Sequence, residues 1–255
     1  MTNVLVGAGD IASCNPDPEA TARLLDSIGG TVITLGDNAY PSGSAADFLR
    51  CYEPTWGRHK ARTRPSPGNH EYESPGAGPY FDYFGASAGF VGDGYYSYEV
   101  GSWLVLSLNS NANIDAQVKW LNDLFARGIP RCTIAYWHHP LYSSGPSEKS
   151  PLVQSLWDVL YYKGGAEVVL SSHDHLYERF APQDERGRLD LERGIRQFVV
   201  GTGGAVLYEP KGIKPNSEVL ISAFGVLKLT LETDSYQWEF IPVSGRGDSG
   251  SGRCH

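Results

Sequence analysis

The sequence lacks any apolar run long enough to cross a membrane. A transmembrane helix needs about 18 consecutive apolar residues, and no segment of the 255 residues reaches that length. Residues 1–10 also lack the positively charged start and the apolar stretch of a signal peptide. We therefore expect no membrane span, and we expect that any secretion leader is absent from this chain.

Basic residues are comparatively few. The chain has 21 Lys and Arg residues against 29 Asp and Glu residues, which gives a formal net charge of -8. Binding to nucleic acid irrespective of sequence needs clustered Lys and Arg side chains that displace counterions from phosphates. We therefore expect no sequence-independent binding to nucleic acid. A phosphate substrate would instead need positive charge from bound metal ions, which are often the largest local charges in a site.

Only four cysteines are present, and none forms a CxxC pair. This spacing makes a zinc ribbon a poor explanation and favours two disulfides. Of the three possible pairings, we predict Cys14 with Cys51 and Cys132 with Cys254, the first joining two loops and the second anchoring the tail. Because disulfides persist in oxidising compartments, we expect a secreted or extracytoplasmic protein. The alternative is four buried thiols in a cytoplasmic one.

Two short apolar runs separated by a helical segment open the chain. Residues 4–6 and 31–35 have the length of buried strands, and each run leads into a glycine and an aspartate. Between them, Asp17 can cap a helix that has Pro18 at its first position, and the glycines at 29–30 end that helix. The pattern indicates a β-α-β unit.

The rest of the chain first repeats this alternation and then loses its helices. Short strands without intervening helices are typical of antiparallel pairing. We predict a mixed α/β fold in a single domain covering residues 1–255, with a Gly/Ser-rich tail at 243–255 that is mobile or anchored by a disulfide. The predicted later strands are 103–108, 132–137, 167–170, 198–200, 226–231 and 236–242, and the predicted later helices are 116–126 and 151–163.

Residue types that bind metals gather just past the ends of the apolar runs. In open α/β sheets, ligands bind beyond the carboxyl ends of the strands, so residues distant in sequence are expected to converge there. Each member alone is explained as a turn, cap or core residue, but five of the seven histidines belong to these segments. The set includes Asp10, Asp37, Asn69 with His70, His138 with His139, and His173 with His175.

This set has too many donors for one tetrahedral zinc. His173 and His175 are separated by one residue, so in an extended segment both side chains leave the same face and can address adjacent metals. The donors therefore predict two metal ions that share one carboxylate. Two ions about 4 Å apart suit in-line displacement at phosphorus.

Five segments resemble, in order, the five blocks of the calcineurin-like metallophosphoesterases. Tyr40 and the run at 173–179 make the chain similar to the purple acid phosphatase branch of that superfamily. Ala12 and Ser172 depart from the pattern, because glycine is usual at both positions. The matching segments are GAGDIAS, LGDNAY, PGNHEY, YWHHPLY and SSHDHLYERF.

The resemblance implies a fold, a pair of metals and a ligand set. The fold is two packed β-sheets flanked by helices in a four-layer sandwich. The metals are Fe(3+) together with Fe(2+), Zn(2+) or Mn(2+). By the same resemblance Asp10, Tyr40 and His175 bind the first metal, Asn69, His138 and His173 bind the second, and Asp37 bridges the two.

For the reaction, we hypothesise that a hydroxide held by the metals attacks the phosphorus of a small phosphate monoester. The resemblance places His70 at the phosphoryl group, and His139 is a second candidate proton donor. Glu71, Glu178 and Arg179 are expected to orient ligands. Further candidates for lining the pocket are Tyr72, Tyr142, Arg58 and His59.

Two other functions remain open at this point. A phosphodiesterase or nucleotidase uses the same metal core, with the pocket loops selecting the ester. A module that binds metal and phosphate without turnover is a hypothesis from another class, and the full ligand set argues against it. The sequence makes no prediction of the physiological substrate or of the oligomeric state.

Overall fold

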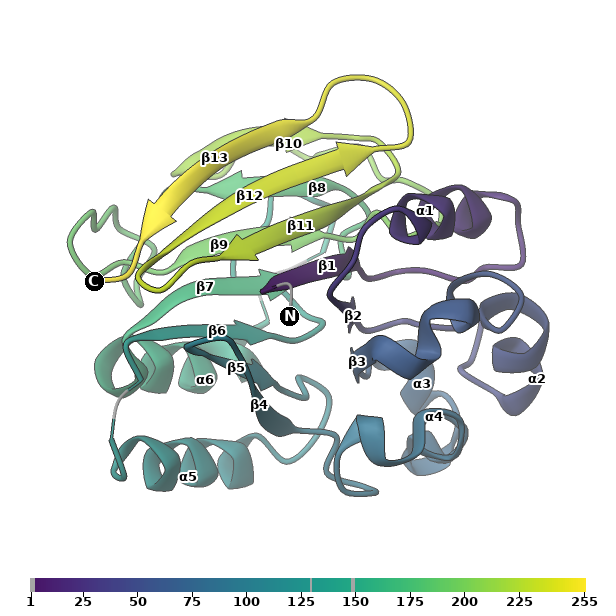
Figure 1. Cartoon of the computed structure of the whole chain (residues 1–255), viewed down its shortest axis with the longest axis horizontal. Coiled ribbons are helices and arrows are strands. Elements are labelled where there is room, and N and C mark those ends of the chain that lie inside the picture. The colour runs from purple at the N-terminus through teal and green to yellow at the C-terminus, as the bar shows by residue number, and fades with distance from the viewer. Residues whose placement is uncertain (1–2, 129, 148–149) are drawn as a thin grey trace.

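A computed structural model describes residues 3–128, 130–147 and 150–255. Two β-sheets pack face to face at the centre of the molecule, and helices flank them (Figure 1). This is the mixed α/β arrangement that the resemblance implied. In the described part of the chain, no helix has both the length and the apolar character of a membrane span.

The six-stranded sheet contains the amino-terminal β-α-β unit and the carboxyl-terminal strands. β1 and β2 are parallel, with Val6 opposite Val32, and β11 pairs antiparallel with β1 on the other side. The strand order is β13 (Asp248–Arg253), β12 (Ser235–Pro242), β11 (Gly225–Leu231), β1 (Val4–Ala8), β2 (Thr31–Leu35) and β3 (Thr63–Ser66).

The seven-stranded sheet contains the second group of parallel strands. β5, β6, β7 and β9 are parallel neighbours, whereas β4, β8 and β10 pair antiparallel. The strand order is β10 (Ser217–Ile221), β8 (Tyr177–Phe180), β9 (Arg196–Val200), β7 (Ala166–Ser171), β6 (Cys132–Tyr136), β5 (Trp103–Ser107) and β4 (Tyr96–Val100).

Alternating side chains of the seven-stranded sheet enter two separate cores. Val105, Ile134 and Val168 point into the core shared with the other sheet. Their neighbours Leu106 and Val169 point the opposite way, toward α5 and α6. The α-helices are α1 (Asp17–Asp26), α2 (Ala45–Asp47), α3 (Asn69–Tyr72), α4 (Gly78–Phe84), α5 (Ile114–Phe125) and α6 (Gln154–Val159).

The start of α1 differs from the prediction. Asp17 is the first helical residue and not the cap, because Pro16 holds the cap position and makes no side-chain hydrogen bond there. Asn15 supplies the missing acceptor, since its Oδ1 lies 3.1 Å from the backbone N–H of Asp17. The predicted cap was therefore wrong by one residue, and Pro18 is the second helical residue and not the first.

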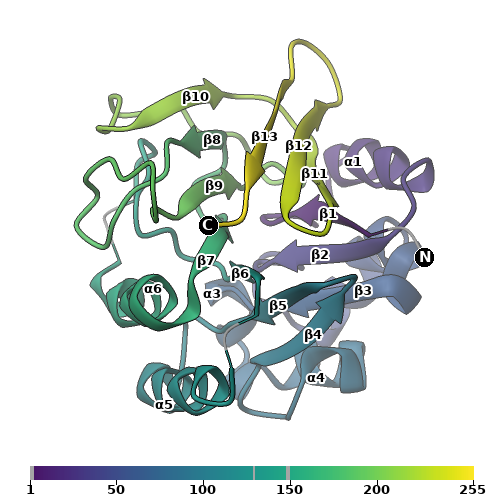
Figure 2. The same cartoon turned by 60° about the vertical axis from the view of Figure 1, so that its left-hand side comes forward.

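Both predicted disulfides are confirmed: Cys14 is bonded to Cys51, and Cys132 to Cys254. The Gly/Ser-rich tail follows the anchored alternative. Its residues 248–253 form β13, which pairs antiparallel with β12 along the edge of the six-stranded sheet (Figure 2).

The glycines of β13 are required by the rings of β12. Gly250 lies opposite Trp238, and a Cβ at position 250 would collide with the indole ring. Gly252 has the same relation to the ring of Tyr236. Because both rings cover glycine backbone, the Gly/Ser composition here belongs to an ordered edge strand.

We expect Gly250→Val to lower the free energy of unfolding by about 1–3 kcal/mol, because a branched side chain would displace the Trp238 ring. Ser251→Val is the matched control, since Ser251 is an exposed neighbour on the other face of the strand and a Val there should change stability by about 0.5 kcal/mol or less. Urea unfolding measures both. Equal stability of the two variants would contradict the ring-over-glycine packing.

Candidate metal centre

The predicted site residues follow the carboxyl ends of parallel strands from both sheets. Asp10 follows β1, Asp37 follows β2, and Asn69 opens α3 directly after β3. His138 and His173 follow β6 and β7. The two sheets meet at this edge, since the backbone N–H of Gly9 donates to the Val200 carbonyl at 2.9 Å. These five of the seven predicted ligands are therefore brought to one edge.

One group of donor atoms surrounds the hydroxyl of Tyr40. Tyr40 Oη lies 2.8 Å from Asp10 Oδ1 and 3.3 Å from His175 Nε2. It also lies 3.1 Å from Asp37 Oδ2, and His175 Nε2 is 3.2 Å from Asp10 Oδ1. These four residues form the tyrosine group.

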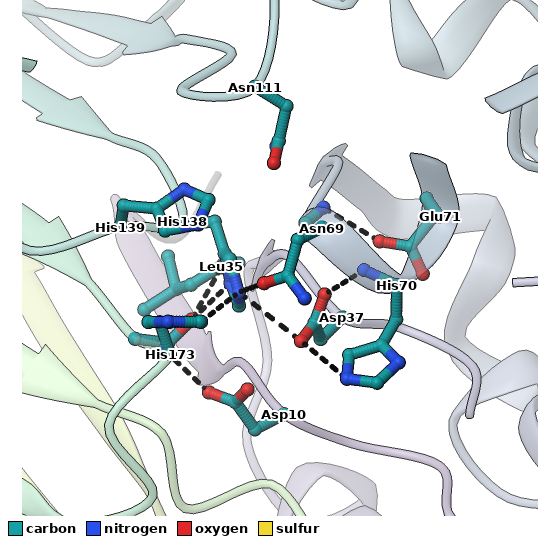
Figure 3. A network of polar contacts seen from close by, with 12 residues as sticks. Asp10, Leu35, Asp37, Asn69, His70, Glu71, Asn111, His138, His139 and His173 are labelled. Carbon is teal, nitrogen blue, oxygen red and sulfur yellow. Dashed lines mark hydrogen bonds and ion pairs between the residues drawn. The ribbon is translucent and has the colours of Figure 1, made fainter. Parts of the chain in front are cut away.

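A second group surrounds the buried imidazole of His138 (Figure 3). His138 Nε2 lies 3.0 Å from Asn69 Oδ1 and 3.1 Å from His173 Nδ1. It is also 3.2 Å from Asp37 Oδ2. We call these four residues the histidine group, and Asp37 Oδ2 is the one atom common to both groups.

Hydrogen bonds to the far side of two rings, those of His138 and His175, direct a lone pair toward the centre. A carbonyl can only accept, so His138 Nδ1 donates to the Leu35 carbonyl at 3.0 Å and His175 Nδ1 donates to the Val206 carbonyl at 2.6 Å. In the neutral rings Nε2 is then unprotonated, as a metal ligand requires.

Each of the two carboxylates likewise uses one oxygen for a backbone hydrogen bond and the other for the centre. Asp10 Oδ2 accepts the backbone N–H of His173 at 2.8 Å, which leaves Oδ1 for the tyrosine group. Asp37 Oδ1 accepts the backbone N–H of His70 at 2.9 Å, which leaves Oδ2 for both groups.

The spacing and chemistry of these donors fit a pair of cations. Ligand atoms about 2.1 Å from an ion and at right angles to each other lie about 3.0 Å apart, and the contacts within each group are 2.8 to 3.3 Å. Imidazole nitrogens with carboxylate and phenol oxygens suit iron, zinc and manganese. Among the described residues, two sets offer ligand atoms that all lie within 4.8 Å of one another: Asp10, Asp37 and His138 in one, and His138, His139 and His173 in the other.

Strong electrostatic coupling accompanies this crowding. Burial opposes ionisation of Asp10 and Asp37, but His175 and His138, respectively, hold the pKa of each carboxyl below its usual range. Burial also disfavours the charged form of His138 and lowers its pKa, but the Asp37 carboxylate overcomes this effect and raises the pKa to about 9. Burial and the carboxylates of Asp10 and Asp37 raise the pKa of Tyr40. Cations at the centre would reverse the shifts of His138 and Tyr40, because they favour neutral imidazole and phenolate.

Glu71 holds together the two loops that supply the ligands. Its buried carboxylate accepts the backbone N–H groups of Asn38 at 2.8 Å, Ala39 at 3.2 Å and Gly68 at 2.7 Å. Burial and the nearby Asp37 raise its pKa to about 7. This geometry agrees with the expectation that Glu71 orients ligands.

The two candidate catalytic histidines lie on different sides of the centre (Figure 3). The side chain of His70 is 32% exposed, its Nδ1 contacts the Pro41 carbonyl, and its Nε2 lies 3.8 Å from Asp37 Oδ2. The ring of His139 has its centroid 4.5 Å from that of His173. Burial and the neighbouring His138 and His173 lower the pKa of His139 to about 3.

Several residues expected near the site lie elsewhere. Arg58 pairs with Glu19 and Asp26 of α1, and His59 contacts the Ala22 carbonyl of the same helix. Their assignment to the pocket was wrong, because these side chains serve to pack α1.

Glu178 and Arg179 also contact other partners. Glu178 accepts the backbone N–H of Ser144 at 2.7 Å, and Arg179 Nε donates to Asp248 at 2.7 Å. Of the remaining pocket candidates, the Tyr72 hydroxyl accepts from the Asn109 amide at 2.7 Å, and the Tyr142 hydroxyl donates to the Glu185 carbonyl at 3.1 Å. None of these four contacts involves a predicted ligand.

Three residues at the centre were missed from the sequence. Ser172 Oγ lies 2.9 Å from His138 Nδ1 and donates to the Leu35 carbonyl at 2.6 Å. The Tyr208 ring stacks on His175 with centroids 3.9 Å apart, and Asn111 extends toward the centre (Figure 3). Only Ser172 carried a signal, as a departure from the usual glycine.

The fold and this donor set together define a metallophosphoesterase-like protein with candidate metal-binding residues. A family model described as "Calcineurin-like phosphoesterase" matches residues 3–177. The chain belongs to this family, whose members are metal-dependent phosphoesterases.

Individual relatives support the same assignment. The chain is 23% identical over 210 residues to "Purple acid phosphatase 15" of Arabidopsis thaliana, a match that covers 67% of this chain and 40% of that protein. This chain therefore spans less than half the length of the curated relative.

Solved structures show the same fold at low identity. A purple acid phosphatase from yellow lupin seeds superposes with a TM-score of 0.77 at 19% identity, over 98% of this chain and 53% of that one. A dimetal phosphatase from Danio rerio gives 0.67 at 11% identity, over 99% of each chain. GAP50 of Plasmodium, described as the anchor in the inner membrane complex, gives 0.74 at 13% identity, over 98% of this chain and 88% of that one.

Proposed function

We propose that this protein is a dinuclear acid-phosphatase-like enzyme that hydrolyses small phosphate monoesters. The observation that carries the proposal is the position of Asp37 Oδ2, which lies 3.1 Å from Tyr40 Oη and 3.2 Å from His138 Nε2. One carboxylate oxygen thus belongs to two complete donor groups, as a bridging ligand would. The purple acid phosphatase relative supports the choice of activity.

In this proposal the tyrosine group holds Fe(3+) and the histidine group holds Fe(2+), Zn(2+) or Mn(2+). The bound ions would neutralise charge on the phosphoryl oxygens and lower the pKa of a water molecule. The chain itself supplies orientation. Its loops are held together by Glu71, and backbone groups contact the far side of Asp10, His138 and His175.

His70 and His139 are the groups proposed to act on the substrate. His70 lies at the exposed side of the centre, and its Nε2 is 3.8 Å from Asp37 Oδ2. In this proposal it contacts a phosphoryl or leaving oxygen and exchanges a proton with it. His139 lies beside the histidine group and can contact the phosphoryl group from the opposite side.

A secreted or extracytoplasmic location is part of the proposal. Two disulfides support it, because such bonds persist outside the reducing cytosol. Mass spectrometry under non-reducing conditions on protein from its native source would detect both bonds, whereas four free thiols would contradict the location.

Asp37→Asn should abolish phosphatase activity and lower the content of both metals, because a neutral amide cannot compensate two cations. Elemental analysis with an aryl monoester and an aryl diester assay measures both effects. Asp26→Asn is a control, since that exposed carboxylate pairs with Arg58 far along α1. Near wild-type turnover by Asp37→Asn would contradict a bridging role, and faster diester hydrolysis by the wild type would favour the phosphodiesterase alternative.

His70→Ala should keep both metals and lose about 10²- to 10⁴-fold in kcat, the usual range for a positioned acid or base. His59→Ala is the matched control, a histidine held by the Ala22 carbonyl that should retain the wild-type rate. Metal content and steady-state rates are measured on the same preparations. Loss of metal in proportion to rate would instead make His70 a ligand.

Tyr40→Phe should remove a visible absorption band from the iron-loaded protein. A phenolate bound to ferric iron absorbs in the visible by charge transfer, so the wild-type protein should be purple or pink. Tyr72→Phe is the control, because the Tyr72 hydroxyl contacts Asn109 and none of the predicted ligands. A colourless iron-loaded wild type, or a Tyr40→Phe variant that keeps the colour, would show that Tyr40 is not a ligand.

A further inference from the structure

Ser110 makes two contacts with the same histidine. Its Oγ accepts the backbone N–H of His139 at 3.1 Å and lies 2.9 Å from His139 Nδ1. The serine is 1% exposed and lies in the loop between β5 and α5. Because β5 and β6 are parallel neighbours, this loop runs beside the end of β6, where His139 is located.

The hydrogen bonds of Ser110 Oγ determine which ring nitrogen of His139 carries the proton. The backbone N–H can only donate, so it occupies one lone pair of Ser110 Oγ. In the described part of the chain, the only other hydrogen-bond partner of that hydroxyl is His139 Nδ1. A buried hydroxyl proton without an acceptor is unfavourable, so Ser110 donates it to Nδ1. The neutral imidazole then carries its own proton on Nε2.

The loop that carries Ser110 is held in place independently of His139. Gln117 of α5 accepts the backbone N–H of Asn109 at 2.9 Å and donates to the Asn109 carbonyl at 2.7 Å. Asn109 Oδ1 in turn accepts the backbone N–H of Asn111 at 3.0 Å. The backbone on both sides of Ser110 is therefore held in place.

Nε2 is the nitrogen of His139 that remains for the centre. The ring lies 4.9 Å from His138 and 4.5 Å from His173, centroid to centroid (Figure 3). An unprotonated Nε2 here would make His139 a third imidazole ligand in the histidine group. A protonated Nε2 cannot bind a cation and can only donate a hydrogen bond.

We propose that Ser110 is a positioning residue that holds His139 with its proton on Nε2, so that the ring donates a hydrogen bond to a phosphoryl oxygen and does not bind metal. This inference rests on the proposed phosphatase function. His70 is held in the opposite way, because its Nδ1 faces the Pro41 carbonyl, which can only accept. His139 therefore presents a protonated Nε2 to the substrate, whereas His70 presents an unprotonated Nε2.

The test is ¹⁵N NMR of the histidine rings in the zinc-loaded full chain without substrate, because ¹⁵N shifts distinguish protonated from unprotonated ring nitrogens. We expect His139 to carry its proton on Nε2 and His70 to carry its proton on Nδ1, so each ring is a control for the other. An unprotonated Nε2 on His139 would overturn the proposal and make that residue a ligand.

Kinetics of variants supply the second measurement. Ser110→Ala should keep both metals and lower kcat for an aryl monoester about tenfold, whereas Ser110→Thr, which keeps the hydroxyl, should stay within about threefold of wild type. Adding Ser110→Ala to His139→Ala should cause no further loss, because the serine acts through the ring. Additive losses would overturn the positioning role.

The experiments distinguish an error in the predicted tautomer of His139 from an error in the proposed phosphatase function. A wild-type protein with the proton on Nε2 of His139 but no turnover of monoester or diester would overturn the proposed function while supporting the action of Ser110 on His139. Turnover by a protein with an unprotonated Nε2 would support the function and overturn the inference.

Discussion

The burial of two carboxylates is the constraint on which the rest of the site depends. Asp10 and Asp37 are 0% and 1% exposed, and an ionised carboxylate in a protein interior costs several kcal/mol unless it is compensated. Imidazolium rings at His138 and His175 can supply the positive charge, but their nitrogens then lose the lone pairs that face the centre. Bound cations would supply the charge and would leave these lone pairs available as ligands, so the donor set fits a pair of bound cations.

The backbone is shaped around these carboxylates. Asp10, Asp37 and His173 have positive φ values of 56°, 49° and 67°, a conformation that costs about 1–2 kcal/mol for a residue with a side chain. Each of the three turns immediately follows a buried strand, and Gly68 leaves room for the Asp37 carboxyl where a Cβ would collide. Unfavourable turns at successive proposed ligands indicate selection for donor geometry over local stability.

The strand ends were predictable because each buried apolar run stops at a polar residue, as at Asp10 and His138. Order in β13 was not, because Gly/Ser composition is typical of a mobile segment and the covering Trp238 lies in another strand. Tyr208 was equally hidden, since it reaches His175 from a loop without a motif. Arg58 was misplaced for a related reason: the charge of a side chain shows that it needs a partner but not which partner the fold brings near.

Histidine roles at the centre follow from what lies behind each ring. Carbonyl oxygens behind His138 and His175 take the proton of Nδ1 and leave Nε2 free to bind a cation. A hydroxyl behind His139 donates to Nδ1 and leaves a proton on Nε2. His70 also has a carbonyl behind it, but its ring is partly exposed and its Nε2 lies 3.8 Å from Asp37 Oδ2, and its proposed contact with the substrate rests on this position. In the proposed site, the function of each histidine therefore depends on whether a hydrogen-bond acceptor or a donor lies behind its ring.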